Sequence, residues 1–126
     1  MLTLSVVTPE GQVHTQSVDE VTVPGLLGEF GVLPGHIALL SAVKPGVLRY
    51  RSGGERGRIA IGPGFAEVDG KGAVVALVSK AARTEKIDRA AAEKALQDAE
   101  ARAKTGDRSA EADSAWAQAQ LETLKG

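Results

Sequence analysis

The sequence contains no cysteine, which excludes disulfide bonds, thiolate metal sites and cysteine nucleophiles together. Aromatic residues make up only 3% of the 126 residues, too few for a platform that stacks on nucleic-acid bases. The longest apolar run, Ala73 to Val78, is far shorter than the roughly 20 residues that cross a bilayer. The formal net charge is −1, without the basic excess of nucleic-acid-binding proteins. We therefore expect a globular protein that binds no nucleic acid.

Glycine, proline and valine almost disappear from the last third of the chain. Of the 15 glycines, 13 lie at or before Gly72, all five prolines lie at or before Pro63, and no valine follows Val78. The remainder is rich in alanine, glutamate and lysine, which favour helices, whereas valine favours strands. This shift predicts an α+β protein with a β domain over residues 1–82 and a helical domain over residues 83–126.

Alternating apolar and polar residues predict short strands in the first part. Leu2, Leu4 and Val6 alternate with more polar neighbours, and Asp69 to Gly72 is a strong hairpin turn. Closely spaced strands with no helical period between them predict an all-β sandwich. After two strands around Val13 to Thr15 and Val18 to Val23, further strands are expected at Val47 to Arg51, Arg58 to Gly62, Phe65 to Asp69 and Ala73 to Ser79.

Two helices are expected in the second part. Thr84 is the predicted N-cap of the first, which begins at about Lys86 and ends before Gly106. The second runs from Asp107 or Ser109 to about Leu124, and so short a connection predicts an antiparallel two-helix hairpin. Alanine contacts bury little apolar area, so we expect a hairpin that detaches easily. The apolar stripe of the first helix is expected at Ile87, Ala91, Ala95 and Ala99, with Ala92, Leu96 and Ala103 beside them.

No residue pattern points to catalysis or metal binding. Gly64 and Gly70 are spaced wrongly for a phosphate-binding loop, and Gly72 stands where that loop needs Ser or Thr. His14 is expected at an exposed strand position and His36 in a Pro-Gly loop, neither with ligands at metal-binding spacing. An enzyme of its own would rest on these two histidines alone.

The segment from Gly25 to Gly46 is expected to be a long apolar loop rich in glycine and proline. A sandwich needs short polar turns, and long loops on a rigid scaffold commonly carry binding function. Trp116, the one large aromatic side chain of the second helix, is expected to pack on the sandwich or the first helix, or else to anchor a partner.

Several stretches of the chain together resemble the epsilon subunit of bacterial F-type ATP synthase. The resemblance spans essentially the whole chain and implies the sandwich and hairpin expected from composition. Its motifs are at residues 6–11, 28–36, 39–49, 64–68 and 74–82.

The resemblance implies a non-catalytic subunit of the central stalk that binds the gamma subunit and the membrane rotor ring. It also implies a peripheral location at the cytoplasmic face of the bacterial plasma membrane, and contact of the hairpin with the catalytic alpha and beta subunits. Glu29 would face the ring and His36 would lie near the stalk contacts. The alternative is a freestanding β-sandwich interaction module with a helical tail. The partner-binding residues implied are Gly28, Glu29, Phe30, Gly31, Pro34, Gly35 and His36.

Some members of that family bind ATP through an Ile-Asp-x-x-Arg-Ala motif in the hairpin. Ile87, Asp88 and Ala92 match it, but Ala91 stands where the motif has arginine. Alanine cannot replace the bidentate phosphate contact of a guanidinium group. We therefore expect no cofactor and no regulatory ATP, and only weak inhibition by an acidic second helix. From Ser109 onward its charged residues are Glu111, Asp113, Glu122 and Lys125.

Overall fold

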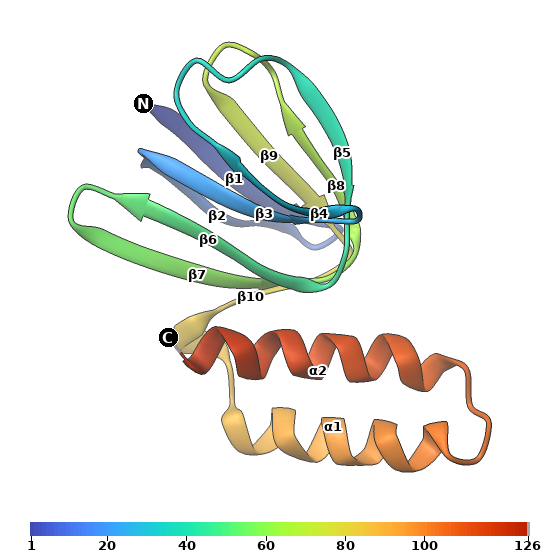
Figure 1. Ribbon diagram of the computed structural model, residues 1–126. Helices are drawn as coiled ribbons and strands as arrows, with labels where there is room; N and C mark the ends of the chain where they lie inside the picture. Colours follow the sequence, from blue (N-terminus) through green and yellow to red (C-terminus); the bar gives the residue numbers. More distant parts are fainter. Residues whose placement is uncertain (126) are drawn as a thin grey trace.

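The computed structural model describes residues 1–125 and shows a β structure with a helical hairpin beneath it (Figure 1). This confirms the α+β class, with strands first and helices last. The strands are β1 (Leu2–Thr8), β2 (Gly11–Val18), β3 (Glu20–Gly25), β4 (Gly28–Val32), β5 (Leu39–Val43), β6 (Gly46–Ser52), β7 (Glu55–Ile61), β8 (Gly64–Val68), β9 (Ala73–Val78) and β10 (Ala81–Arg83). A 3-10 turn, η1 (Thr84–Lys86), leads into α1 (Arg89–Ala103) and α2 (Ser109–Lys125).

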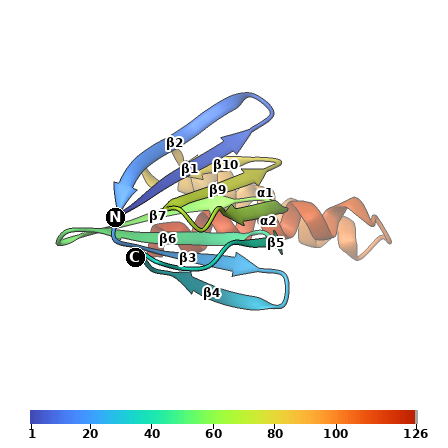
Figure 2. The ribbon, with the colours of Figure 1, turned by 90° about the horizontal axis from the view of Figure 1, so that it is seen from above.

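The strands form two packed layers. Their order is β10-β7-β6-β3-β5-β8-β9-β1-β2, and β4 pairs with β3. Only Gly25 and Val43 pair between β3 and β5, so the sheet turns a corner there. Figure 2 shows β2 and β4 at opposite edges. One layer is therefore β4-β3-β6-β7-β10 and the other is β5-β8-β9-β1-β2, as expected for a sandwich.

Alternating side chains from both layers fill the space between them. Leu2, Leu4 and Val6 of β1 are buried as their alternation predicts. Burying side chains of this size stabilises the fold by about 1.5–3 kcal/mol each. The same cluster includes Val18, Val21, Val23, Val32, Val43, Leu48, Ile59, Ile61, Ala66, Val68, Val74, Ala76 and Val78.

The predicted turn at Asp69 to Gly72 joins β8 to β9 as an antiparallel hairpin. Gly70 and Gly72 adopt φ values of +79° and +104°, which side chains rarely tolerate. Asp69 Oδ1 accepts hydrogen bonds from the backbone N–H groups of Lys71 (2.7 Å) and Ala73 (2.9 Å). These bonds, the one from Ala73 first, lower the pKa of Asp69.

The prediction of one long loop from Gly25 to Gly46 is wrong. The segment contains β4 and β5, and a two-residue turn at Leu26 and Leu27 joins β3 to β4. The sequences of β4 and β5 show no alternation of apolar and polar residues, because each strand buries few side chains. Strand β4 has glycine at positions 28 and 31, and β5 has exposed leucines at positions 39 and 40. The longest irregular connection covers residues 33–38, and a two-residue connection at 44–45 joins β5 to β6.

The first helix begins three residues later than predicted, at Arg89, and its N-cap is Asp88 rather than Thr84. Asp88 Oδ1 accepts the N–H of Ala91 at 3.1 Å. The Thr84 hydroxyl instead donates to the backbone carbonyl of Arg58 at 3.1 Å, which ties η1 to the sandwich. Gly106 has φ +86° after the helix, as its predicted role requires.

The expected apolar stripe of α1 is partly wrong. Ala92 and Ala99 are buried, but Ala91 and Ala95 are exposed. Alanine lies on several faces of this helix, so its sequence does not single out one of them. The side that faces α2 becomes the buried one.

Helix α2 lies between α1 and the outer face of β6 and β7 (Figure 1). Trp116 of α2 is half-buried, and the ammonium group of Lys80, which follows β9, lies 5.6 Å from its ring centroid. Strand β10 spans the predicted boundary at residue 82, since it pairs with β7 through Arg83. The division into two domains at that point stays a prediction.

Candidate functional site

The residues expected to bind partners begin on strand β4. Gly28, Glu29 and Gly31 are exposed, whereas Phe30 is half-buried against the core. Glu29 Oε2 lies 3.4 Å from Nη1 of Arg49 on β6, so this carboxylate lies on the outer face of the layer that packs on the hairpin. Phe30 therefore belongs to the packing of the sandwich, whereas Glu29 is exposed on the hairpin side.

Pro34, Gly35 and His36 form a tight turn after β4. Gly35 has φ +90°, and the His36 N–H donates to the carbonyl of Leu33 at 3.0 Å. His36 Nδ1 lies 2.7 Å from the carbonyl oxygen of Ile37. Figure 1 shows this connection at the end of the sandwich farthest from the helices.

The structure does not bring Glu29 and His36 together. Glu29 is the second residue of β4, while His36 lies four residues beyond the end of that strand. A strand advances about 3.3 Å per residue, so the two side chains belong to different ends of the sandwich. The nine residues from Gly28 to His36 thus contribute to two surfaces.

Large apolar side chains outside the predicted partner-binding set are exposed at the end that carries His36. Leu33 is 54% exposed, Ile37 78% and Leu40 66%. Exposed apolar groups gathered in one place are typical of an interaction surface. In the sequence, the feature that indicates this surface is the presence of apolar residues beside a Pro-Gly turn.

A second exposed apolar row crosses the outer face of β5, β8, β9 and β1. Ala42 pairs with Phe65, Phe65 with Leu77, and Leu77 with Val7. Phe65 and Leu77 are each more than half exposed. Both alternate with buried residues, so each stands at a strand position where a polar residue is expected. A large apolar residue at such a position is the feature of the sequence that indicates this row.

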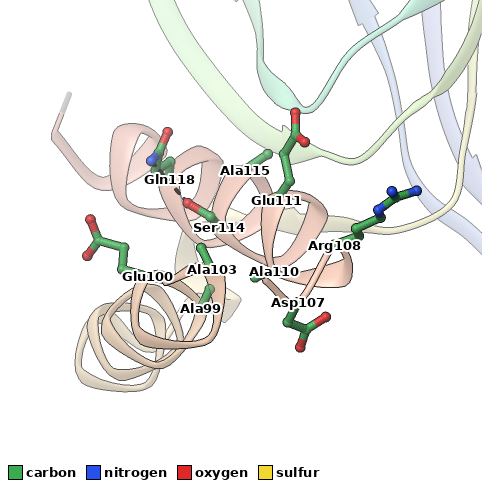
Figure 3. Close-up of a pocket in the computed structure, with 10 residues that line it drawn as sticks. All are labelled: Ala99, Glu100, Ala103, Asp107, Arg108, Ala110, Glu111, Ser114, Ala115 and Gln118. Atoms are coloured by element: carbon green, nitrogen blue, oxygen red, sulfur yellow. Dashed lines mark hydrogen bonds between the residues drawn. The ribbon is translucent and has the colours of Figure 1, made fainter. Parts of the chain in front are cut away.

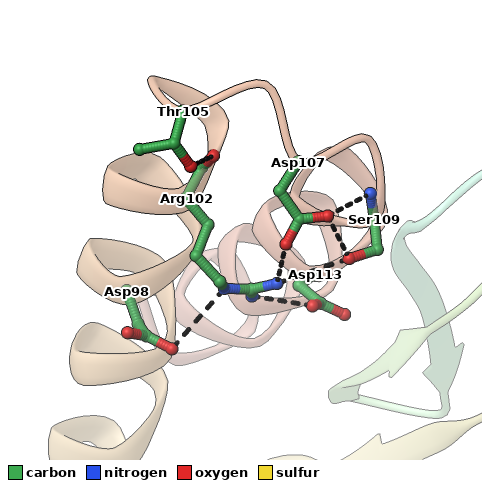
Figure 4. A network of polar contacts seen from close by, with 6 residues as sticks. All are labelled: Asp98, Arg102, Thr105, Asp107, Ser109 and Asp113. Atoms are coloured by element: carbon green, nitrogen blue, oxygen red, sulfur yellow. Dashed lines mark hydrogen bonds and ion pairs between the residues drawn. The ribbon is translucent and has the colours of Figure 1, made fainter.

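The turn of the hairpin is held by one arginine (Figure 4). Arg102 of α1 binds Asp113 of α2 at 2.8 Å, Asp107 at 3.1 Å and Asp98 at 3.7 Å. Hydrogen bonds from the hydroxyl and N–H of Ser109, and then from Arg102, lower the pKa of Asp107. The pKa of Arg102 is raised, first by its bond to Asp113.

An open groove of about 730 Å³ lies between the two helices near this turn (Figure 3). Its one cation, Arg108, is accompanied by Glu100, Asp107 and Glu111, a setting that repels phosphates. Ile87, Asp88 and Ala92, the residues that match the ATP motif, do not line it. The Asp88 carboxylate is engaged in capping α1.

The expectation that His14 is exposed is wrong. The side chain is half-buried, with Nε2 2.9 Å from Gln16 Oε1 and the ring centroid 5.2 Å from that of Tyr50. A register shift between Val6 and Val7 on the neighbouring strand changes the alternation beside it. In the part of the chain that the structure describes, no three His, Asp or Glu side chains gather as a metal site.

Similarity to known proteins identifies the family of this chain. The family model described as the ATP synthase Delta/Epsilon chain beta-sandwich domain matches residues 1–84. The chain belongs to the ATP synthase delta/epsilon family. It is 49% identical over 98 residues to an ATP synthase epsilon chain of Synechococcus sp. (strain CC9605), a match that covers 78% of this chain and 71% of that one. It is 45% identical over 101 residues to ATP synthase epsilon chain 2 of Syntrophotalea carbinolica, covering 80% and 72%.

Solved structures extend the likeness to the hairpin. A chain in the mitochondrial ATP synthase of Euglena gracilis (OSCP/F1/c-ring) superposes with a TM-score of 0.75 at 27% identity, over 98% of this chain and 77% of that one. Membership in the epsilon family makes the chain a rotor-stalk subunit of ATP synthase. No helix within residues 1–125 has both the length and the apolar character needed to span a bilayer.

Proposed function

We propose that this subunit is non-catalytic and joins the gamma subunit to the membrane rotor ring. The observation that carries the proposal is the exposed apolar surface at the end of the sandwich, where Leu33, Ile37 and Leu40 face solvent. Leaving such groups in water costs free energy that burial against a partner recovers, at about 25 cal/mol per Å². Family membership sets aside the freestanding module as an alternative.

Two surfaces of the sandwich suit the two partners. The turn at Pro34 to His36 projects from the end opposite the hairpin, so we assign this end to the rotor ring. The apolar row through Phe65 and Leu77 lies on the face of a sheet, where it can contact the surface of a folded protein. We assign this contact to the gamma subunit. Glu29 lies on the hairpin side beside Arg49, so its contact is with a partner that reaches that side.

This arrangement would hold the chain peripherally at the cytoplasmic face of the plasma membrane through the complex. The hairpin lies on the opposite side of the sandwich from the proposed ring contact (Figure 1). From there it would extend toward the catalytic alpha and beta subunits. Its acidic second helix would bind them weakly.

Affinity capture of the tagged chain from its own cells tests the proposal. We expect the gamma and ring subunits to accompany the unmodified chain. The double variant Leu33→Ser, Ile37→Ser should lose the ring and keep gamma, while Phe65→Ser should lose gamma. Ala95→Ser, at an exposed position of α1, is the matched control.

His36→Ala and Glu29→Lys should each weaken assembly without unfolding the sandwich, as circular dichroism would verify. Glu29→Lys also replaces the ion pair to Arg49 by a repulsion. Capture of neither partner by the unmodified chain, or full assembly of the surface variants, would contradict the proposal.

A further inference from the structure

The outer face of β6 and β7 carries four arginines in two consecutive cross-strand pairs. Arg49 lies opposite Arg58, and Arg51 lies opposite Arg56. They point away from the core, since Leu48, which alternates with Arg49, is buried. Like charges directly opposite on a sheet destabilise it, so folding gives no reason for this arrangement.

Two of these arginines have carboxylate partners within the chain. Arg49 lies 3.4 Å from Glu29, and Arg51 lies 3.5 Å from Asp19. The side chains of these two arginines and of their two carboxylate partners are between 31% and 58% exposed. Exposed ion pairs of this length contribute little free energy, so a competing anion can replace the carboxylates as partners of these arginines at small cost. Asp19 keeps its other hydrogen bond, from the N–H of Gly53 at 2.7 Å.

The other two arginines are differently occupied. Arg58 donates from Nε to the carbonyl of Thr123 at 2.7 Å, which uses one of its five N–H groups. Arg56 is exposed and forms no ion pair with any residue from 1 to 125. Several guanidinium N–H groups therefore face solvent without a fixed acceptor.

A recess of about 180 Å³ lies among the four arginines. Thr22 and one carboxylate, Glu20, also line it. It is smaller than the roughly 300–1,000 Å³ of pockets that enclose a drug-sized ligand, so it suits one small group.

We propose that this recess binds inorganic hydrogen phosphate. Guanidinium groups bind phosphate oxygens in pairs, and the Thr22 hydroxyl supplies a further donor. The Glu20 carboxylate is an acceptor only. It therefore accepts the O–H that hydrogen phosphate retains near neutral pH and repels sulfate, which has none. This site is separate from the apolar surfaces assigned to the stalk partners.

Titration of the ¹⁵N-labelled full chain at constant ionic strength tests the site, with inorganic phosphate, sulfate and ribose 5-phosphate as probes. We expect phosphate to give saturable shifts of the amides of residues 49–58. Arg56→Gln, which breaks no ion pair, should weaken binding about tenfold or more. Glu20→Gln should make sulfate bind as tightly as phosphate. Arg89→Gln, at an exposed position of α1, is the matched control.

Three results would overturn the proposal: no saturable shift with phosphate, shifts confined to the helices, or equal weakening by Arg56→Gln and Arg89→Gln. Equal binding of sulfate and phosphate by the unmodified chain would remove the role of Glu20, and with it the assignment of hydrogen phosphate. Near neutral pH the phosphate of ribose 5-phosphate is mainly a dianion without an O–H, so tighter binding of this monoester than of inorganic phosphate would contradict the assignment. The reverse order, which the small recess favours, would support the free anion.

Discussion

Arg58 of β7 and Thr123 of α2 are joined by a hydrogen bond of 2.7 Å from the guanidinium Nε to the backbone carbonyl. Thr123 lies in the last turn of α2, whose carbonyls have no partner within the helix. A cation at that end also interacts favourably with the helix dipole. The contact therefore fastens the hairpin to the sandwich at the end where α2 stops.

Replacing Arg58 by methionine should loosen α2 while the sandwich stays folded. Methionine keeps much of the apolar stem but donates no hydrogen bond, so docking should lose about 1–3 kcal/mol. Amide exchange of α2 should then quicken by roughly tenfold or more. Arg56→Met, on the same strand and without a hydrogen bond or ion pair to α2, is the control. Unchanged exchange in Arg58→Met would show that the bond does not hold the hairpin.

Two glycines that look alike in the sequence should differ in how much alanine destabilises the fold. A Cβ at Gly64 would collide with the backbone oxygen of Leu77, whereas one at Gly31 meets nothing within 4 Å. Gly64→Ala should lower the free energy of unfolding by about 1–3 kcal/mol or more. Gly31→Ala should change it by less than about 0.5 kcal/mol. Urea denaturation measures both, and equal values would contradict the packing described.

The stability of the hairpin should fall in acid because of Asp107. Its folded pKa lies below the ordinary value of 3.8, so the ionised carboxylate stabilises the folded state above about pH 4. That contribution is lost as the pH falls through the folded pKa. Asp107→Asn should therefore melt at lower temperature at pH 7 and depend less on pH between 6 and 2. Parallel pH curves of melting temperature, followed by helical circular dichroism, would refute this.

ATP should bind weakly or not at all, and Ala91→Arg should increase its affinity. Ala91 is exposed on the first turn of α1, next to the motif residues Ile87 and Asp88. A new charge-assisted contact typically strengthens binding by about 10- to 150-fold. Ala95→Arg, one turn further along the same helix, is the control. Calorimetry that finds tight ATP binding by the unmodified chain would reject the prediction.

The sandwich should fold without the helices. A chain ended after Lys86 keeps the pairing of β10 with β7 and the bond from Thr84 to Arg58. Its β spectrum and cooperative melting should resemble those of the whole chain. Ending at Ala82 instead removes the pair between Arg83 and Ile59 and should cost stability. An unfolded 1–86 chain would show that the hairpin is integral to the fold.

The sequence predicts an element well where it buries regular alternating side chains. Leu2, Leu4 and Val6 of β1 are an example, because burial and period agree there. It predicts poorly where few side chains are buried, as in β4, or where small residues cover several faces, as in α1. Thr84 was mistaken for the N-cap since its hydroxyl finds a partner on β7, a contact that no local pattern reveals.

The partner-binding residues stay a prediction, and the sequence does not show how they are arranged in space. The motif from Gly28 to His36 is continuous in sequence, yet β4 carries its two ends to different surfaces. The register of β5, β8 and β9 aligns Phe65 and Leu77 into one apolar row, and register is a property of pairing that a single strand does not encode.

Site-directed cross-linking tests the central claim most directly. Because the chain has no cysteine, Ile37→Cys creates a unique thiol at the exposed end of the sandwich. In membranes that contain the assembled enzyme, a short thiol-reactive cross-linker should join this position to the rotor-ring subunit. It should not join Lys94→Cys, on α1, to the ring. A ring cross-link from Lys94→Cys and none from Ile37→Cys would contradict the proposed orientation on the rotor.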